Sequence, residues 1–305
     1  RHQEVRGLAQ AAAQVVLDVD ERRLSRADGD GDVVDAVGPR VLERQRAAEA
    51  HAALPAHAPQ LQPQLHAEPP KPRNGDKLLV INDDGFSSFH SGRYKTADDL
   101  KKQMLRFRDT QVGVFEWCIA AGSRVNFPSK TCELIGTGVT EFPRRGDKLA
   151  AEKLQKLAAD GVDTLKVVAE ACHEAGMTCY ASLRMNGDYS AGWMGESLPR
   201  MLNSTFWWQH PEFRVRGKKG EDQTKLSYAF PEVRAFKLGI LREAAERDID
   251  GINLDFLRHP PCFGYEEPLI AAFKAKHGQD AREIAADDPR WLQLRADIMT
   301  GFLRD

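Results

Sequence analysis

The sequence predicts an α/β protein and, within that class, a (β/α)8 barrel of the TIM type. From about residue 76 onward, strand-like and helix-like segments alternate, which is typical of parallel βα units. The predicted strands are apolar on one face and polar on the other. A doubly wound sheet would need two apolar faces, because helices cover both. A closed barrel has helices only outside, and its inner face can be polar near the catalytic mouth.

The alternating elements follow from local patterns. We expect strands over residues 77–85, 112–120, 177–186 and 248–260, and helices over 96–110, 161–176, 230–248, 265–278 and 289–305. Each strand is a short apolar run with alternating faces. Thr96 is a suitable N-cap for the first helix, Asp163 caps the second, and Gly176 ends it. An apolar stripe predicts that the third helix packs on the sheet; it comprises Val233, Phe236, Ile240 and Ala244.

Residues 1–75 differ in composition from the rest and are rich in Pro, Ala and Arg. The first 70 residues contain no Phe, Trp, Tyr, Cys, Lys, Ile, Met, Asn or Thr. A segment without aromatic residues buries too little apolar surface to offset the entropy lost on ordering. We therefore predict a disordered leader, followed by a barrel domain over residues 76–305. The missing residue types also fit a stretch that is not native coding sequence, and both interpretations stay open.

Overall composition excludes several classes of partner. The chain has 43 basic and 45 acidic residues, a balance that gives no support for a nucleic-acid partner. No run approaches the roughly 18 apolar residues of a membrane span. The five cysteines include no Cys-x-x-Cys pair, so we expect reduced thiols, and no cofactor or metal is predicted. The chain begins at Arg1 without a readable signal peptide, so compartment and oligomeric state are not assigned.

Polar side chains gather at the carboxyl ends of the predicted strands, where sites form in parallel α/β folds. They are Asp83 and Asp84 on the first strand, Glu116 on the second, Arg184 and Asn186 on the third, and Asp255 on the fourth. Asp255 shares its strand face with Asn253. An acid there suits catalysis; the alternative is a structural acid that bridges to Arg184 or Arg258. The long connection over residues 186–230 is typical of an active-site loop.

Several segments resemble the bacterial family-10-like glycosyl hydrolase domain, a TIM barrel. They are INDDG, FEWCIAAGSRVNFPSK, HEAGMTCYASLRMN, FPEVRAFKLGILREA and DIDGINLDFLRHPP, and the resemblance spans roughly residues 76–305. Its most specific piece is Asp-Gly-x-x-Leu-Asp-Phe-x-Arg, from Asp250 to Arg258. Family members often carry an acid directly after the Asn of the third strand. Here Gly187 precedes Asp188, so the resemblance assigns that acid no role.

The resemblance implies a carbohydrate substrate and a longer barrel. An eight-stranded barrel takes about 250 residues, yet this region supplies four clear strands. We therefore expect a barrel truncated after about four βα units, which is the N-terminal half of the fold. A second catalytic carboxylate would then lie beyond residue 305. A periplasmic or extracellular location would be usual for the family.

Glycoside hydrolysis needs one carboxyl group to protonate the leaving oxygen and a second to attack the anomeric carbon or activate water. Asp255 is the first candidate, followed by Glu116 and Asp84. Candidates for substrate binding are Asp83, Trp117, Arg184, Asn186, Arg258 and His259. Among these, Trp117 is expected to stack on a sugar ring. The alternatives are a carbohydrate-binding barrel without turnover and a metal-dependent hydrolase with Asp83, Asp84 and Asp255 as oxygen ligands.

Overall fold

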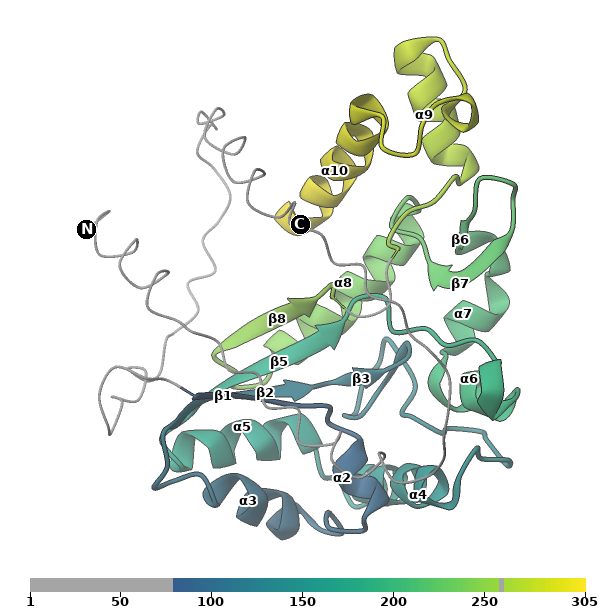
Figure 1. The fold of residues 1–305 in the computed structure, drawn as a ribbon. Helices are drawn as coiled ribbons and strands as arrows, with labels where there is room; N and C mark the ends of the chain where they lie inside the picture. The colour runs from purple at the N-terminus through teal and green to yellow at the C-terminus, as the bar shows by residue number, and fades with distance from the viewer. Residues whose placement is uncertain (1–78, 258–260) are drawn as a thin grey trace, which may run out of the picture. The chain divides into compact units, whose positions relative to one another are not determined.

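The computed structural model describes residues 79–257 and 261–305 of the chain (Figure 1). The predicted leader, residues 1–75, lies outside the described residues. Two of the substrate-binding candidates, Arg258 and His259, also lie outside them.

The centre of the fold is a sheet of four parallel strands. They are β1 (Leu79–Asp83), β2 (Val112–Cys118), β5 (Thr178–Arg184) and β8 (Gly251–Asp255), side by side in that order. All four lie within the predicted strands, so the α/β class and the parallel pairing are confirmed. The spatial order follows the order in the sequence, without the reversal that marks a doubly wound sheet.

The described helices are α2 (Ser87–His90), α3 (Ala97–Leu105), α4 (Arg145–Ala159), α5 (Thr164–Glu174), α6 (Ser197–Leu202), α7 (Thr205–Gln209), α8 (Pro231–Ala245), α9 (Glu267–His277) and α10 (Pro289–Arg304). Each of the five predicted helices is present, as α3, α5, α8, α9 and α10, and the described residues also form α2, α4, α6 and α7. Thr96 caps α3 and shares a capping box with Asp99, and Asp163 caps α5. Gly176 follows α5 in the left-handed conformation. The predicted apolar stripe of α8 is buried.

Structure that the sequence did not predict lies mainly between the second strand and the second helix, and in the long connection after β5. The first stretch contains α4 and a small hairpin of β3 (Ala120–Ala121) and β4 (Arg124–Val125). The second contains α6, α7 and a hairpin of β6 (Arg214–Arg216) and β7 (Asp222–Leu226). Short 3₁₀ turns cover Gly192–Met194, Pro211–Phe213 and Ala281–Glu283.

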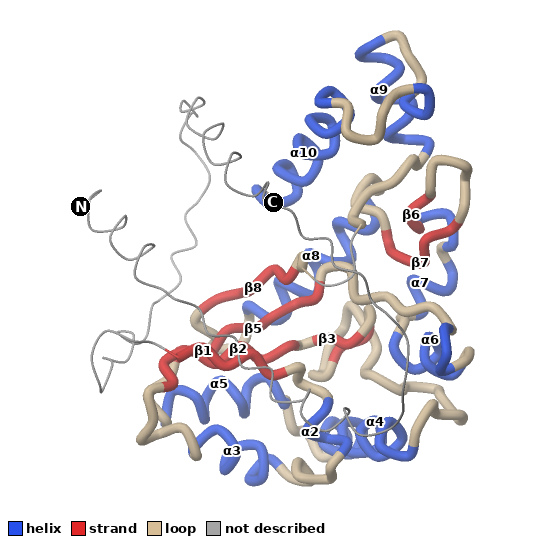
Figure 2. The backbone as a smooth tube through the Cα atoms, viewed as in Figure 1, coloured by secondary structure: helices blue, strands red, loops and turns tan. Residues whose placement is uncertain are grey.

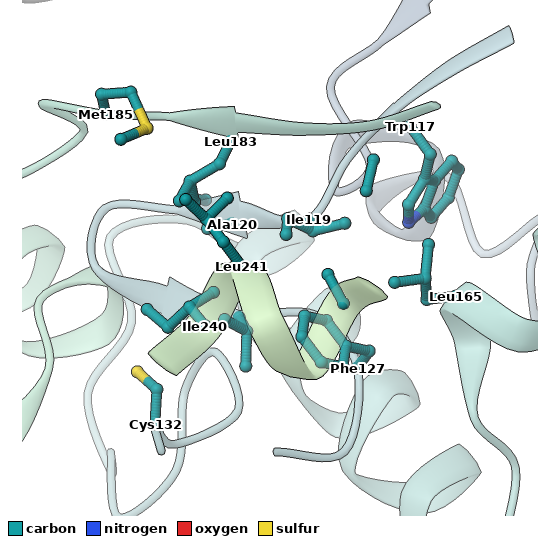
Figure 3. Close-up of a cluster of buried hydrophobic side chains, with 14 of the residues drawn as sticks. Trp117, Ile119, Ala120, Phe127, Cys132, Leu165, Leu183, Met185, Ile240 and Leu241 are labelled. Carbon is teal, nitrogen blue, oxygen red and sulfur yellow. The ribbon is translucent and has the colours of Figure 1, made fainter. Parts of the chain in front are cut away.

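The apolar core lies between the helices and one face of the sheet. Helix α5 packs on β2 and β5, α8 packs on β8, and α3 covers α5 (Figure 2). Figure 3 shows Trp117 and Leu183 of the sheet above Leu165 of α5 and Ile240 and Leu241 of α8. The helix-side face of the sheet is therefore the apolar one. The five cysteines are all free thiols, and four of them are buried.

A buried carboxylate, Asp147, joins α4 to the segment that follows β1. Its side chain is inaccessible to solvent and lies 3.1 Å from His90 Nε2 and 2.9 Å from Arg144 Nε. Burial by itself raises the pKa of Asp147, but the ion pairs with His90 and Arg144 outweigh it and hold the pKa at about 2, below the usual 3.8. The ionised carboxylate therefore stabilises the fold above pH 3.8, and this stabilisation is lost as the pH falls toward 2.

We expect Asp147→Asn to lower the free energy of unfolding by about 2 kcal/mol at pH 7, since one pKa unit corresponds to about 1.4 kcal/mol. Chemical denaturation of both proteins at pH 7 and pH 3 measures the effect. The difference should shrink at pH 3, because the folded-state advantage of the carboxylate is already falling there. An equal difference at both pH values would show that Asp147 contributes shape rather than charge.

The outer edge of β8 borders an apolar groove of about 280 Å³. The large apolar residues that line it are Leu238 and Leu241 of α8, Ile252 and Leu254 of β8, and Phe302 and Leu303 of α10. Ile252 is 36% exposed and Leu303 is 53% exposed. Within the described chain, no strand pairs with this edge of β8. An open strand edge beside exposed apolar side chains is a template for association.

We therefore expect residues 1–305, produced alone, to self-associate through the β8 edge, and Leu303→Lys to weaken the association. Sedimentation velocity over a range of concentrations measures it. Leu292→Lys is the matched control, because Leu292 lies on the same helix and is 38% exposed but does not line this groove. A wild-type monomer at every concentration would contradict the expectation, and so would equal effects of the two variants.

Candidate functional site

The face of the sheet opposite the core carries the polar side chains. Strand register places Asn82 beside Glu116, Glu116 beside Tyr180, Ser182 beside Asn253, and Arg184 beside Asp255. Residues in register on neighbouring strands point to the same side of a sheet. The predicted alternation in the last strand is therefore confirmed: Asn253 and Asp255 share this face, and Ile252 and Leu254 share the other. We call it the polar face.

Glu116 is the acid on the polar face that is held by side chains of two other strands. Its Oε2 atom accepts a hydrogen bond from Asn82 Nδ2 at 2.7 Å and another from Asn253 Nδ2 at 3.0 Å. No donor among the described residues reaches its second oxygen, Oε1. The two amides come from β1 and β8, so Glu116 joins three of the four strands. We call Asn82 and Asn253 the amide clamp.

Asp255 lies at the carboxyl end of β8, at the rim of the polar face. Its Oδ1 atom accepts a hydrogen bond from the backbone N–H of Leu257 at 2.9 Å, and its carbonyl oxygen accepts one from Met185 at the same distance. Within the described part of the chain, Oδ2 accepts no hydrogen bond. Arg184 lies beside it in register. Among the described residues, one oxygen of Asp255 is thus fixed by a hydrogen bond, the other accepts none, and Arg184 lies beside them.

Arg184 is nearly buried, at 9% exposed. Burial by itself lowers the pKa of its guanidinium, but electrostatic interactions with Cys118, Tyr189, Asp84 and Asp255 outweigh burial and raise the pKa above its usual value. The side chain forms no ion pair within 4 Å in the described regions. Arg184 is therefore a permanent cation at the rim, placed to compensate two acids without being tied to either.

Asp84, the third catalytic candidate, has a different environment. Its Oδ1 atom accepts hydrogen bonds from the backbone N–H groups of Phe86 and Ser87, at 3.1 and 2.7 Å, and its Oδ2 atom accepts one from the Ser87 hydroxyl. Both oxygens are used to shape the turn that leads into α2. Asp84 follows β1 directly and lies close enough to act electrostatically on Arg184.

Two of the predicted substrate-binding residues lie on the wrong side of the sheet. Trp117 is fully buried and packs against Phe89 and Phe115 in the core, so the prediction that it stacks on a sugar ring is wrong. Its neighbour Glu116 faces the polar side, and adjacent strand residues face opposite ways. Asp83 is in register with Trp117 and shares its face. Asp83 is therefore separated from Glu116 and Asp255 by the sheet.

Asn186 lies beyond the end of β5 and is buried. Its amide nitrogen donates to the carbonyl oxygen of Pro261 at 2.5 Å and lies 3.2 Å from the sulfur of Cys262. These contacts tie the loop after β5 to the loop after β8. Its amide nitrogen is thus engaged, while its amide oxygen accepts no hydrogen bond from the described residues, so substrate binding by Asn186 stays a prediction.

The acids proposed for a metal-dependent hydrolase do not converge. Asp83 and Asp255 lie on opposite faces of the sheet. Both oxygens of Asp84 accept hydrogen bonds within the turn that follows β1. In residues 79–257 and 261–305, no group of three His, Cys, Asp or Glu side chains is close enough to hold a metal ion. The prediction that Asp83, Asp84 and Asp255 together bind a metal ion is therefore wrong.

The sequence-based prediction missed the amide clamp. Asn253 was placed on the polar face but given no role, and Asn82 was passed over for the two acids that follow it. The alternation of strand faces was a usable signal, because it places Asn82 and Asp84 on one face and Asp83 on the other. Asp188, left without a role, is buried and fixes the long connection: its backbone carbonyl oxygen accepts a hydrogen bond from the Lys225 ammonium, and its Oδ2 atom accepts one from the Leu226 N–H.

The region that matches a known protein family contains only part of this site. The model of the glycosyl hydrolase-like 10 family matches residues 124–305, which is more than half of the chain. The chain belongs to the glycosyl hydrolase-like 10 family. The matched region includes Arg184, Asn253 and Asp255 and begins later than residue 76, where the sequence resemblance was expected to start. Glu116 precedes it.

Two solved structures are similar to this glycosyl hydrolase-like 10 chain. One is α-L-fucosidase isoenzyme 2 from Paenibacillus thiaminolyticus, with 15% identity, a TM-score of 0.46, and coverage of 74% of this chain and 29% of the fucosidase. The other is a noncanonic maltogenic α-amylase from Thermotoga neapolitana, with 14% identity, a TM-score of 0.35, and coverage of 66% and 43%. The chain thus spans less than half the length of either. No curated protein sequence matches it. Among the described helices, none combines the length and apolar character needed to cross a membrane.

Proposed function

We propose that the protein is a glycoside hydrolase that acts on a poly- or oligosaccharide through Glu116 and Asp255. The observation that supports this best is the state of their oxygens. Each carboxylate lies on the polar face with one oxygen held by hydrogen bonds, while its second oxygen accepts none from the described residues. A held oxygen fixes the group, and the available oxygen can exchange a proton or attack carbon. Asp84 has no such oxygen and is the weaker candidate.

We also propose that the sheet belongs to a (β/α)8 barrel, with the polar face inside. Two observations support this: the strand order follows the sequence, and Asn253 of β8 reaches across β5 to Glu116 of β2. In a flat sheet, strands two apart are separated by about 9.6 Å. Contact between alternate strands is how the layers inside a barrel are built. Such a barrel would use the four described strands and further ones, and its mouth would lie at Asp255.

The chemistry follows from the two environments. Glu116 would donate its proton to the glycosidic oxygen as the bond from that oxygen to the anomeric carbon breaks. Asp255 would use its available oxygen to attack the anomeric carbon or to take a proton from the attacking water. Arg184 lies beside Asp255, and its positive charge suits a carboxylate that acts as an anion. Glu116 is held by neutral amides, which suits a group that donates a proton. In either route, water supplies the OH of the released sugar and the proton that restores Glu116.

A panel of oligosaccharides tests this function in the full-length protein. We expect turnover of at least one member, unchanged by EDTA. Turnover that EDTA abolishes and a divalent cation restores would favour the metal-dependent alternative. Binding of a glycan by calorimetry without any turnover would favour a carbohydrate-binding barrel, and absence of both would contradict a carbohydrate site.

A further inference from the structure

We propose that the amide clamp, Asn82 and Asn253, positions Glu116 so that Oε1 alone exchanges the catalytic proton. Both amides donate to Oε2, which leaves Oε1 as the only oxygen that can carry a proton toward a substrate. This inference rests on the proposed function and adds to it two positioning residues and the atom that reacts.

The amide clamp carries no charge, and this suits a residue such as Glu116 that must give up and regain a proton. A carboxyl oxygen has two lone pairs and accepts two hydrogen bonds, whether the group is ionised or carries its proton on the other oxygen. The clamp can therefore stay intact while Glu116 gives up and regains a proton. An Arg or Lys in the same place would favour the ionised form alone. Asn82 and Asn253 thus hold the group without fixing its charge.

The clamp also fixes direction. Asn82 lies beside Glu116 on the neighbouring strand, while Asn253 approaches from β8, two strands away on the opposite side. Ser182 of the intervening strand is in register with Asn253 and is buried. Its small side chain leaves the space through which the Asn253 amide reaches Glu116. Donors from two sides restrict rotation of the carboxyl group, which matters because a misplacement of about 1 Å can cost roughly 100-fold in rate.

Other ionisable groups share the polar face and bear on any pH dependence. They are Asp84 after β1, Cys118 on β2, Tyr180 and Arg184 on β5, and Asp255 on β8. None of them forms a hydrogen bond or ion pair with Glu116 among residues 79–257 and 261–305. Changes at the clamp should therefore act on Glu116 first.

The test uses Asn253→Ala and Asn253→Asp in the full-length protein, with the substrate found by the glycan panel. We expect Asn253→Ala to lower kcat by about 10- to 100-fold with little change in KM, because positioning is lost while binding is kept. Asn253→Asp places a second carboxyl group against Glu116, which disfavours ionisation. The alkaline limb of the pH profile should therefore move up by about one pH unit or more. Asn82→Ala should resemble Asn253→Ala.

Two further measurements separate positioning from folding and from the function itself. A ¹³C NMR titration of the Glu116 carboxyl, assigned with Glu116→Gln, should show the same upward shift in Asn253→Asp. Asn203→Ala is the control: Asn203 is fully buried and makes two backbone hydrogen bonds to Tyr189, so it should cost stability without moving the limb. Suppose that Glu116→Gln is inactive, but that Asn253→Asp moves neither the alkaline limb of the pH profile nor the Glu116 titration. That result would overturn the inference about the amide clamp and leave the proposed function standing. Full activity of Glu116→Gln would overturn the proposed function as well.

Discussion

Asp255→Asn is expected to lower kcat by at least about 100-fold in the full-length protein, the range for loss of a nucleophile or general base. The amide keeps the shape of the side chain and can still accept the hydrogen bond from the Leu257 N–H. It cannot supply the negative oxygen that attacks carbon or takes a proton from water. Stability should change little. Steady-state kinetics and a thermal melt on the same preparation measure both effects.

Asp250→Asn is the matched control for Asp255. Asp250 directly precedes β8, at the end far from the rim, and its carboxylate contacts His173 Nε2 and the Cys179 N–H, both at 2.8 Å. Its loss should lower the melting temperature while kcat stays within about twofold of the wild type, since no reacting atom is nearby. If Asp255→Asn instead unfolds the protein or keeps full turnover, Asp255 is a structural acid and the proposed mechanism fails.

Glu116→Gln is expected to lower kcat by about 100- to 10,000-fold on substrates with a sugar leaving group, the range for general acid catalysis. Gln can turn its carbonyl oxygen toward the amide clamp, so the two hydrogen bonds on Glu116 are kept. The NH₂ group then takes the place of Oε1, and it has no proton to give at neutral pH.

The identity of the leaving group separates the two roles. An activated glycoside, such as a dinitrophenyl or fluoride glycoside of the preferred sugar, leaves without protonation. Glu116→Gln should therefore recover most of its activity on that substrate, while Asp255→Asn should not. If both variants recover, Asp255 is not the attacking group or base. If neither recovers, Glu116 is also needed after the leaving group departs, which is the base role that a retaining mechanism gives to the acid.

Local patterns predicted much of this fold. Thr96 and Asp163 cap helices where a cap was expected, and the α8 stripe packs on the sheet. Helix α4 was missed because Arg144 offers no side-chain cap and Asp147, a charged residue, faces inward. An acid on the buried side breaks the apolar pattern by which an amphipathic helix is identified.

The candidate site was predicted less completely, for a different reason. Alternation within one strand puts Asp255 on the polar face and should have put Trp117 on the other, since it follows Glu116 directly. Trp117 was instead judged by its closeness in sequence to an acid. The contact between Asn253 and Glu116 depends on the register and lateral order of three strands. No pattern within a single segment contains that information.

The hydrogen bonds on Glu116 also have a consequence for the order of folding. Its two partners are 34 and 137 positions away along the chain. Closing a longer loop costs more entropy, and contacts between distant residues form late. The bond from Asn253 can form only after β8 has docked beside β5. Nascent or half-folded chains would then hold Glu116 without a fixed orientation, so hydrolytic competence would arise in the last stage of folding rather than growing in step with it.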